Sequence, residues 1–151
     1  MSSDVDALGS NRMTDGEVNE LLSRVGVGVL SLARDGEAYG VPVSFGFDGE
    51  ETLYFVFVGY GAESRKEAFA AETARASFTA FEVTDRDRWR SVVVGGRLES
   101  VDREEWTGAT EAIEANAWYP SLFRTADPTG GLEIWALRID ERSGLHGGAG
   151  P

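Results

Sequence analysis

A short basic segment, Ser64-Arg65-Lys66-Glu67, is the part of this sequence most suited to binding a charged ligand. Its Ser-x-x-Glu spacing is that of a capping box, which predicts that a helix begins there. Cations at the first two helical positions oppose the helix dipole, and Lys66 is the only lysine in the chain. A phosphate would meet free backbone N–H groups, the Ser64 hydroxyl, a guanidinium and an ammonium together. The segment therefore predicts either a phosphate site or an ordinary helix cap whose basic side chains point into solvent.

The strand expected over residues 37–47 has one small face. Its larger residues alternate with four small ones: Gly40, Pro42, Ser44 and Gly46. A flat ring could lie against the backbone on this small face, where no bulky side chain intervenes. Pro42 also lacks an N–H, which fits a strand position that does not pair with a neighbour. A tight corner of a barrel would have the same pattern, so both interpretations stay open.

Two further runs are apolar enough to be strands in the interior of the fold. Residues 52–58 are apolar on both faces, which indicates a strand inside a barrel or at an interface. Residues 89–96 begin with Trp89 and continue through Ser91 and Val92 to a Gly-Gly pair. Taken by itself, this second run predicts a plain strand with an aromatic anchor.

Residues that could act as an acid, base, nucleophile or metal ligand are scarce. The only histidine, His146, lies in a glycine-rich stretch typical of a mobile tail, and no other base is available for a Ser-His-Asp triad. With no cysteine and no histidine cluster, no metal site is expected. The carboxylate pairs Glu50-Glu51 and Glu104-Glu105 indicate a solvated surface rather than acid–base chemistry. No catalytic side chain and no metal ligand is predicted.

The charge balance excludes several classes of partner. The 151 residues include 26 Asp and Glu against 14 Lys and Arg, a formal net charge of −12. Nucleic acids and anionic membranes both need a basic face, so neither is an expected partner. No apolar run reaches the ~18 residues of a membrane span, and the first eleven residues have no apolar core of a signal peptide. A cytoplasmic protein is expected.

The basic residues are almost all arginine, 13 of the 14. An acidic, lysine-poor surface is typical of a halophilic protein, because at ~1 M salt the Debye length falls to ~3 Å and repulsion between carboxylates largely vanishes. An acidic protein of an ordinary cytoplasm would look similar, so this second interpretation stays open.

Apolar periodicity and turn signals divide the chain into strands with short helices between them. Thr14 opens the first helix with a capping box, Asp35-Gly36 predicts a hairpin turn, a bulge is expected in the first strand, and Gly95-Gly96 predicts a bend. The expected helical elements cover residues 14–24, 65–72, 102–113 and 119–123, and the expected strands cover 25–34, 37–47, 52–58, 76–83, 89–101 and 132–140.

Six strands with helices at the corners predict a mainly β fold, a small antiparallel barrel that removes exposed sheet edges. Its side chains would fill its interior, so a ligand would lie outside it, between two copies. Residues 13–143 are expected to form this single domain, after a flexible acidic leader, 1–12, and before a flexible glycine-rich tail, 144–151.

Three segments in a fixed order and spacing resemble a known family. They are Tyr39 to Phe45, then Leu53-Tyr54-Phe55 ahead of Ser64-Arg65-Lys66, then Trp89 to Gly95. In this order they resemble the pyridoxamine 5′-phosphate oxidase-like family of flavin-binding split barrels, over about residues 14–101. The resemblance implies a homodimeric, six-stranded antiparallel split β-barrel with FMN in two grooves at the subunit interface.

The resemblance also implies which residues bind the cofactor. Arg65 and Lys66 would hold the FMN phosphate, with Ser64 beside them. Four consecutive strand residues would lie along the isoalloxazine ring: Val41, Pro42, Val43 and Ser44. Phe57 and Val58 would lie near the ribityl chain, and Ser91 with Val92 would reach the cofactor bound to the partner subunit.

Two departures from the family bear on the reaction. The oxidases have an Arg and His pair near the C-terminus that binds and processes pyridoxamine phosphate, whereas His146 lies in the predicted tail, so neither that reaction nor haem handling is expected. Where Ser91 stands, they commonly have Gln. The sequence therefore predicts an FMN-binding oxidoreductase with an unidentified small substrate. The alternatives are a non-catalytic flavin carrier or sensor, and a split barrel that binds deazaflavin F420 or no cofactor.

Overall fold

The computed structural model describes residues 10–58, 73–116 and 132–148. Within these ranges the chain forms one antiparallel sheet in the order β3-β2-β6-β7-β8-β5-β4, with β1 paired to β8. The helical elements are α2 (Asp15–Arg24), a 3₁₀ turn (Arg103–Glu105) and α4 (Trp106–Asn116). The strands are β1 (Ser10–Arg12), β2 (Val27–Arg34), β3 (Glu37–Ser44), β4 (Gly46–Phe47), β5 (Thr52–Val58), β6 (Arg75–Asp85), β7 (Arg88–Ser100) and β8 (Leu132–Gly147).

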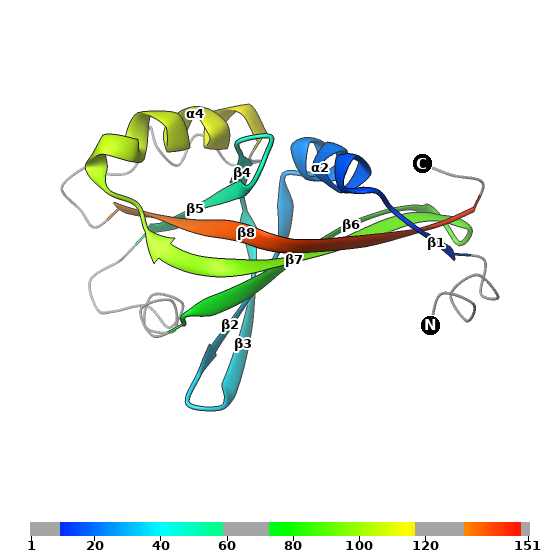
Figure 1. Cartoon of the computed structure of the whole chain (residues 1–151), viewed down its shortest axis with the longest axis horizontal. Coiled ribbons are helices and arrows are strands. Elements are labelled where there is room, and N and C mark those ends of the chain that lie inside the picture. The colour runs from blue at the N-terminus through cyan, green and yellow to red at the C-terminus, as the bar shows by residue number, and fades with distance from the viewer. Residues whose placement is uncertain (1–9, 59–72, 117–131, 149–151) are drawn as a thin grey trace.

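The sheet is curled into a half-barrel, so the prediction of a mainly β, antiparallel split barrel with short flanking helices is confirmed. In the described ranges, the six expected strands are present, but the strand predicted over 37–47 is divided into β3 and β4, β8 extends beyond its predicted end at 140, and β1 was not predicted. Both helices lie at the top of the view in Figure 1, where α2 packs on the core face of the sheet and α4 on the opposite face of β5, and the β2–β3 hairpin projects downward. The helical segments predicted over 65–72 and 119–123 lie outside the described residues. None of the described helices is long and apolar enough to cross a membrane.

The first helix begins as its sequence predicts. The Thr14 backbone N–H donates to Glu17 Oε1 at 2.8 Å, and the Glu17 N–H donates to Thr14 Oγ1 at 3.2 Å. This reciprocal pair is the capping box. The apolar stripe of α2, which includes Val18, Leu21 and Leu22, is fully buried against the sheet.

The β2–β3 hairpin is confirmed, but the predicted bulge in β2 is wrong. Asp35 and Gly36 have φ of +49° and +79°, as a tight two-residue hairpin turn requires. The register then runs without interruption to Val27 opposite Ser44. No phase shift is needed, because the inward position near the start of β2 is Gly28 rather than a valine. A Cβ on Gly28 would lie 2.4 Å from Cζ of Phe78, whose ring fills that space.

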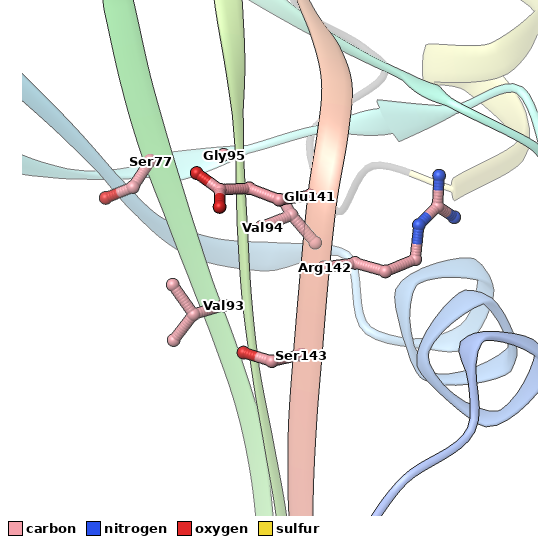
Figure 2. A pocket seen from close by; sticks show the side chains of 7 residues that line it. All are labelled: Ser77, Val93, Val94, Gly95, Glu141, Arg142 and Ser143. Carbon is pink, nitrogen blue, oxygen red and sulfur yellow. The ribbon is translucent and has the colours of Figure 1, made fainter.

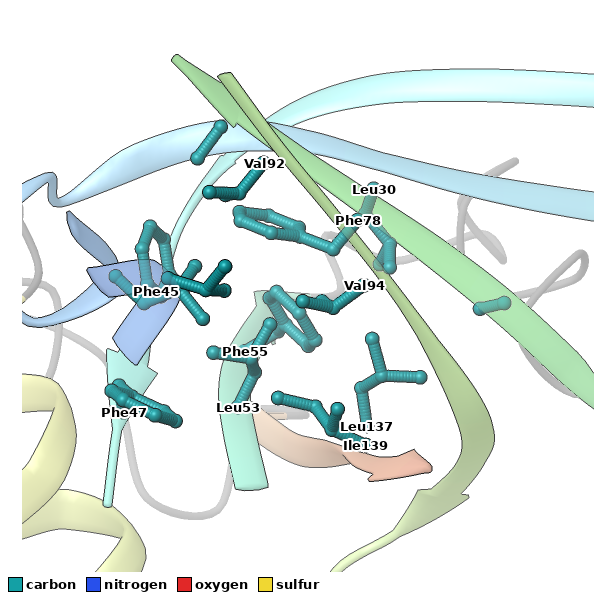
Figure 3. Close-up of a cluster of buried hydrophobic side chains, with 14 of the residues drawn as sticks. Leu30, Phe45, Phe47, Leu53, Phe55, Phe78, Val92, Val94, Leu137 and Ile139 are labelled. Carbon is teal, nitrogen blue, oxygen red and sulfur yellow. The ribbon is translucent and has the colours of Figure 1, made fainter. Parts of the chain in front are cut away.

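The core lies inside the curl of the sheet and is built around three phenylalanine rings. Phe45, Phe55 and Phe78 are fully buried, and the Phe78 ring centroid is 4.7 Å from that of Phe45 and 5.5 Å from that of Phe55 (Figure 3). The opposite face of β5 carries Tyr54, which belongs to a second buried cluster under α4 together with Ile113. Burial on both faces explains why β5 is apolar throughout.

The bend predicted at Gly95-Gly96 is present as a β-bulge. Gly95 pairs with Glu141 and Gly96 pairs with Ile139, so Asp140 is the extra residue in β8. A Cβ on Gly96 would lie 1.8 Å from the Arg138 carbonyl oxygen, so this close approach of two strands requires glycine.

The flexible tail predicted from residue 144 is wrong over 144–147, which form the end of β8. His146 pairs with Asn11 of β1 on one side and with Arg90 of β7 on the other, and it is only 7% exposed. The glycines there are close-packing positions rather than flexible ones, because a Cβ on Gly144 would meet Met13 Sδ at 2.8 Å. Residues 10–12 of the predicted leader likewise form a strand.

Gly28→Ala is expected to lower the free energy of unfolding by about 1–3 kcal/mol, because the new methyl group overpacks a core that has no free space. The matched control is Gly108→Ala on α4, where nothing lies within 4 Å of an added Cβ. This control should raise the free energy of unfolding by about 0.5–1 kcal/mol, since alanine is the better helix former. Urea denaturation of both variants checks the prediction, and equal effects would contradict the packing at Gly28.

Candidate functional site

The sheet has an inner face that lines the core and an outer face that the core does not use. Strand register aligns residues across the outer face in rows, because directly opposite residues point to the same side. One row runs Pro42, Val29, Thr79, Val93, Ser143, and the next runs Gly40, Ser31, Ser77, Gly95, Glu141. Small residues dominate both rows, so the outer face is smooth from β3 to β8.

The pleat of the strands divides the predicted ring-binding residues between the two faces. Pro42 and Ser44 lie on the outer face, whereas Val41 and Val43 point inward and pack against the main core. In the described sheet β3 pairs only with β2, so Pro42 lies on an edge strand, where proline is tolerated. The small face predicted from the sequence is therefore present at Gly40, Pro42 and Ser44, but the prediction is wrong for Gly46, which lies in β4 and packs against α4.

For the other predicted cofactor residues, the structure describes the side-chain positions of only some. Ser91 lies on the outer face opposite Phe81, but Val92 is fully buried in the core, so its side chain is not available to a ligand. Phe57 and Val58 end β5, where only the backbone is described. The phosphate-binding residues predicted from the sequence lie outside the described residues: Ser64, Arg65 and Lys66.

Ser44 has an unpartnered hydroxyl. Its Oγ is buried and has no hydrogen-bond partner among the described residues. Buried hydroxyl groups normally have a partner, and a polar atom of a bound molecule or an ordered water next to β3 would supply one. The residues of this edge thus fit a ligand that has a flat ring and polar substituents.

The two candidate contact regions lie far apart on one chain. Between Pro42 on β3 and Ser91 on β7 stand β2 and β6, which makes three strand spacings, or ~14 Å. A ring lying over Pro42 would therefore not touch Ser91 of the same chain. Ser91 can contact such a ring only when it belongs to a second copy.

The outer face also carries the large apolar side chains that are exposed in the described part of the chain. Phe81 is 58% exposed, Val83 is 64% exposed and Val93 is 46% exposed. Phe81 and Val93 stand on neighbouring strands on the same side of the sheet as Ser91. We call these three residues the outer patch. Three such side chains on two neighbouring strands make this part of the outer face apolar.

The one histidine lies away from the outer face. His146 is on the same side of β8 as Gly144, which packs against Met13 and Val18. Its Nδ1 atom is buried without a hydrogen-bond partner among the described residues. His146 is thus buried beneath α2 and does not contribute to the outer face.

A curled antiparallel sheet with two short helices and an open outer face defines a split β-barrel. A sequence model described as pyridoxamine 5′-phosphate oxidase matches residues 14–146. The chain therefore belongs to the pyridoxamine 5′-phosphate oxidase family. Comparison with curated protein sequences gives no match.

Solved structures share this fold at low sequence identity. An FAD-binding protein from Mesorhizobium loti is 20% identical with a TM-score of 0.75, covering 92% of this chain and 99% of its own. An FAD and heme binding protein from Mycobacterium smegmatis is 19% identical with a TM-score of 0.71, covering 95% and 75%. An FAD binding protein from the same organism is 20% identical with a TM-score of 0.68, covering 92% and 100%.

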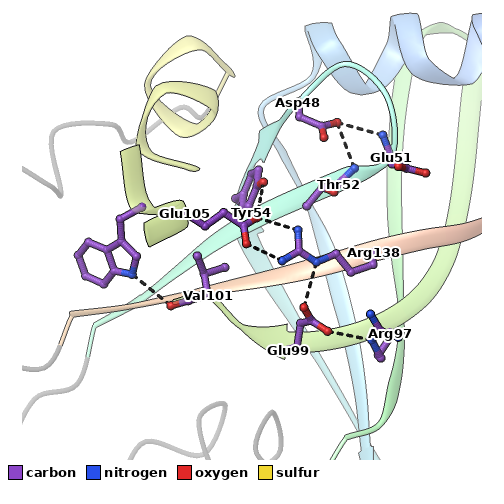
Figure 4. A network of polar contacts seen from close by, with 10 residues as sticks. Asp48, Glu51, Thr52, Tyr54, Arg97, Glu99, Val101, Glu105 and Arg138 are labelled. Carbon is purple, nitrogen blue, oxygen red and sulfur yellow. Dashed lines mark hydrogen bonds and ion pairs between the residues drawn. The ribbon is translucent and has the colours of Figure 1, made fainter. Parts of the chain in front are cut away.

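Two carboxylates near α4, Glu99 and Glu105, have pKa values lowered by hydrogen bonds from arginine side chains. Arg138 donates to both oxygens of Glu105 at 2.8 Å and to Glu99 at 3.2 Å, and the Tyr54 hydroxyl donates to Glu105 at 2.8 Å (Figure 4). The Arg138 hydrogen bonds hold the pKa of Glu105 below its usual range, and burial together with Glu105 raises the pKa of Tyr54 to about 12. Of the predicted surface pair Glu104-Glu105, Glu104 is exposed, whereas Glu105 is only partly exposed because its carboxylate is held by Arg138 and Tyr54.

Glu105→Gln is expected to make the stability of the protein less sensitive to acid. A carboxyl whose folded pKa is lowered stabilises the fold above its unfolded pKa, and this contribution is lost as the pH falls through the folded pKa. The wild-type protein should lose about 0.5–1 kcal/mol more than the variant from about pH 5 down to about pH 2, since the pair is partly exposed. Denaturation at a series of pH values measures this, with Glu104→Gln as the control. Identical pH profiles for Glu105→Gln and the wild type would contradict the network.

Proposed function

We propose that this protein is an FMN-binding oxidoreductase that acts as a homodimer, with each flavin held between two chains. The family supports this proposal, and the names of the solved neighbours support a flavin as the class of ligand. The observation that carries it is the outer face, where one continuous surface joins Pro42 and Ser44, the outer patch and Ser91.

Each part of this surface has a role in the proposal. The flavin ring lies along β3 over Pro42, and its polar edge supplies a partner for Ser44 Oγ. Ser91 of the second copy closes the site from the other side. The outer patch packs against the same patch of the second copy, and this removes its apolar side chains from water. Water is thereby excluded from one face of the ring.

The phosphate end rests on the basic segment of the sequence. Arg65 and Lys66 hold the phosphate by charge-assisted hydrogen bonds, with the Ser64 hydroxyl beside them. Phe57 and Val58 lead from β5 toward this segment and border the ribityl chain. A bound flavin would supply hydride or electron transfer at its N5 atom. The protein binds and shields it, and no side chain acts as acid or nucleophile.

Visible absorption of the purified protein tests the proposal first. The spectrum of an oxidised flavin is expected, and mass spectrometry of the released cofactor should identify FMN. Release of FAD would support a flavin site but identify the cofactor as FAD instead of FMN. Release of F420 would overturn the flavin assignment. Turnover of NADH or NADPH with an electron acceptor separates an enzyme from a carrier or sensor. A colourless protein that does not bind added FMN in concentrated salt refutes the proposal.

The double variant Arg65→Ala/Lys66→Ala is expected to bind FMN about 100-fold more weakly, because it removes two hydrogen bonds from charged donors to the phosphate. Riboflavin has the same ring and no phosphate, so its affinity should change less than about threefold. Fluorescence titration of the flavin-free protein with both ligands measures the difference. Arg12→Ala removes an exposed arginine elsewhere and serves as the control. Equal losses of affinity for FMN and riboflavin would mean that the phosphate does not bind at Arg65 and Lys66.

Phe81→Glu is expected to dissociate the dimer, because it puts a charge into the centre of the outer patch. Truncation of a central aromatic contact typically costs 2 kcal/mol or more, so the dissociation constant should rise at least ~30-fold. Thr107→Glu adds the same charge to an exposed position on α4 and is the control. Light scattering gives the mass of each variant, and bound flavin should be lost with the dimer. A dimeric Phe81→Glu protein would place the interface on another surface.

A further inference from the structure

A single residue, Phe45, joins the two ends of the curled sheet. The strands β3 and β4 stand at opposite ends of the strand order, yet β3 ends at Ser44 and β4 begins at Gly46. The Phe45 side chain is fully buried, and its backbone N–H donates to the Gly26 carbonyl oxygen at 3.1 Å. The position of Phe45 therefore decides how the two ends meet and where Ser44, the residue before it, is held.

Asn116, the last residue of α4, binds this junction through its side chain. The amide nitrogen donates to the carbonyl oxygens of Phe45 and Leu22 at 3.2 Å and to that of Val25 at 3.4 Å. Leu22 and Val25 lie in and directly after the last turn of α2, where backbone carbonyls have no partner within the helix. One amide group thus connects α4, the end of α2 and the junction between β3 and β4.

The backbone of α4 also packs on this junction. A Cβ on Gly46 would lie 2.4 Å from the Ile113 backbone nitrogen and 2.6 Å from the Ala112 carbonyl carbon, so the helix lies directly on β4. Ile113 is itself buried in the cluster under α4. Because the helix that carries Asn116 is held in place, the hydrogen bond from Asn116 can fix the Phe45 carbonyl.

The junction lies next to the edge assigned to the flavin ring. Ser44 Oγ is buried on the outer face, and the proposed function gives it a polar atom of the ring as its partner. Phe45 is held at its N–H by Gly26 and at its carbonyl by Asn116, so a displacement of Ser44 would strain one of these bonds. A displacement of about 1 Å is enough to impair a binding site.

We propose that Asn116 is a positioning residue of the ring-binding site. Its amide group fixes Phe45 and thereby the Ser44 hydroxyl, so it acts through the β3–β4 junction rather than through a contact with the flavin. This role rests on the proposed function, which supplies the ligand. Asn116 lies 71 residues from Phe45 along the chain, so no local pattern in the sequence indicates it.

Asn19 on α2 provides a matched control, because its side chain accepts a hydrogen bond where that of Asn116 donates. Figure 2, which shows the pocket between β6, β7 and β8, also shows the Arg142 side chain directed toward α2, where it donates to Asn19 Oδ1. Asn116→Asp and Asn19→Asp keep the shape of the side chain and add the same charge. Asn116→Asp removes both donors, whereas Asn19→Asp keeps the accepting oxygen. Asn116→Ala removes the donors without adding a charge.

Amide hydrogen exchange, followed by NMR in the full-length protein without ligand, tests the junction by itself. In Asn116→Asp and Asn116→Ala the Phe45 amide should exchange at least about tenfold faster relative to the Phe78 amide of the core, because the junction opens locally. Asn19→Asp should leave this ratio unchanged. An unchanged ratio in both Asn116 variants overturns the proposal.

Fluorescence titration with flavins tests the role in binding. Asn116→Ala should weaken FMN and riboflavin equally, about tenfold, because the loss concerns the ring that both ligands share. Val94→Ala leaves a cavity in the core on β7, three strands from β3, and should lower stability while changing both affinities less than about twofold. An effect of Val94→Ala as large as that of Asn116→Ala would mean that only global stability matters, and it overturns the proposal.

A double-mutant cycle separates positioning from a purely structural role. In a Ser44→Ala background, Asn116→Ala should weaken flavin binding less than about threefold, since the hydroxyl group that it positions is gone. Full additivity of the two changes overturns the proposal. If the wild-type protein binds no flavin, the proposed function fails, whereas faster exchange at Phe45 would still support the action of Asn116 on the junction. If the wild-type protein binds flavin and Asn116→Ala binds it equally well, only the positioning role fails.

Discussion

The contact between the Phe78 ring and Gly28 is the constraint on which the rest of the fold depends. The ring occupies the space that any side chain at Gly28 would fill, and it also contacts Phe45 and Phe55. It thereby joins β6 to β2, to β5 and to the junction between β3 and β4, which curls the sheet. Side chains alternate between the two faces of a strand, so packing one face into this core leaves every second residue on the outer face. The outer face is a consequence of the core rather than an independent feature.

The sequence predicts the strands well because their turns and alternation are local. Asp35-Gly36 and the Thr14 capping box act within four residues, and both are present as expected. The sequence is misleading at some glycines, because a glycine can either make the backbone flexible or leave room for a neighbouring side chain. Gly144 and Gly147 resemble a flexible tail, yet a Cβ on either would overlap Met13 or Trp89, from segments far away in the chain. A single sequence does not distinguish a glycine that makes the backbone flexible from one that is required because another side chain packs against it.

The candidate site was predictable in part, and the reason is again the distinction between local and distant partners. The alternation that isolates Pro42 and Ser44 on one face is local, so the small face of β3 could be predicted. The position of Glu141 opposite Gly95 could not, because it depends on the bulge at Asp140 and on a strand that lies 46 residues earlier. The same holds for Glu105, whose partner Arg138 lies on a strand after a long connection. Ion pairs across a sheet have no sequence spacing by which to predict them.

Because basic side chains are few, single arginines interact with more than one carboxylate. Arg138 is shared by Glu99 and Glu105, and Arg75 is shared by Asp140 and Glu141, so each guanidinium holds two carboxylates. A net charge of −12 acts weakly over distance, since screening limits it to ~8 Å at physiological salt and ~3 Å at 1 M. Binding is therefore decided at contact. An anion needs several cations in one place, and the adjacent pair Arg65-Lys66 is the one that the sequence predicts for this role.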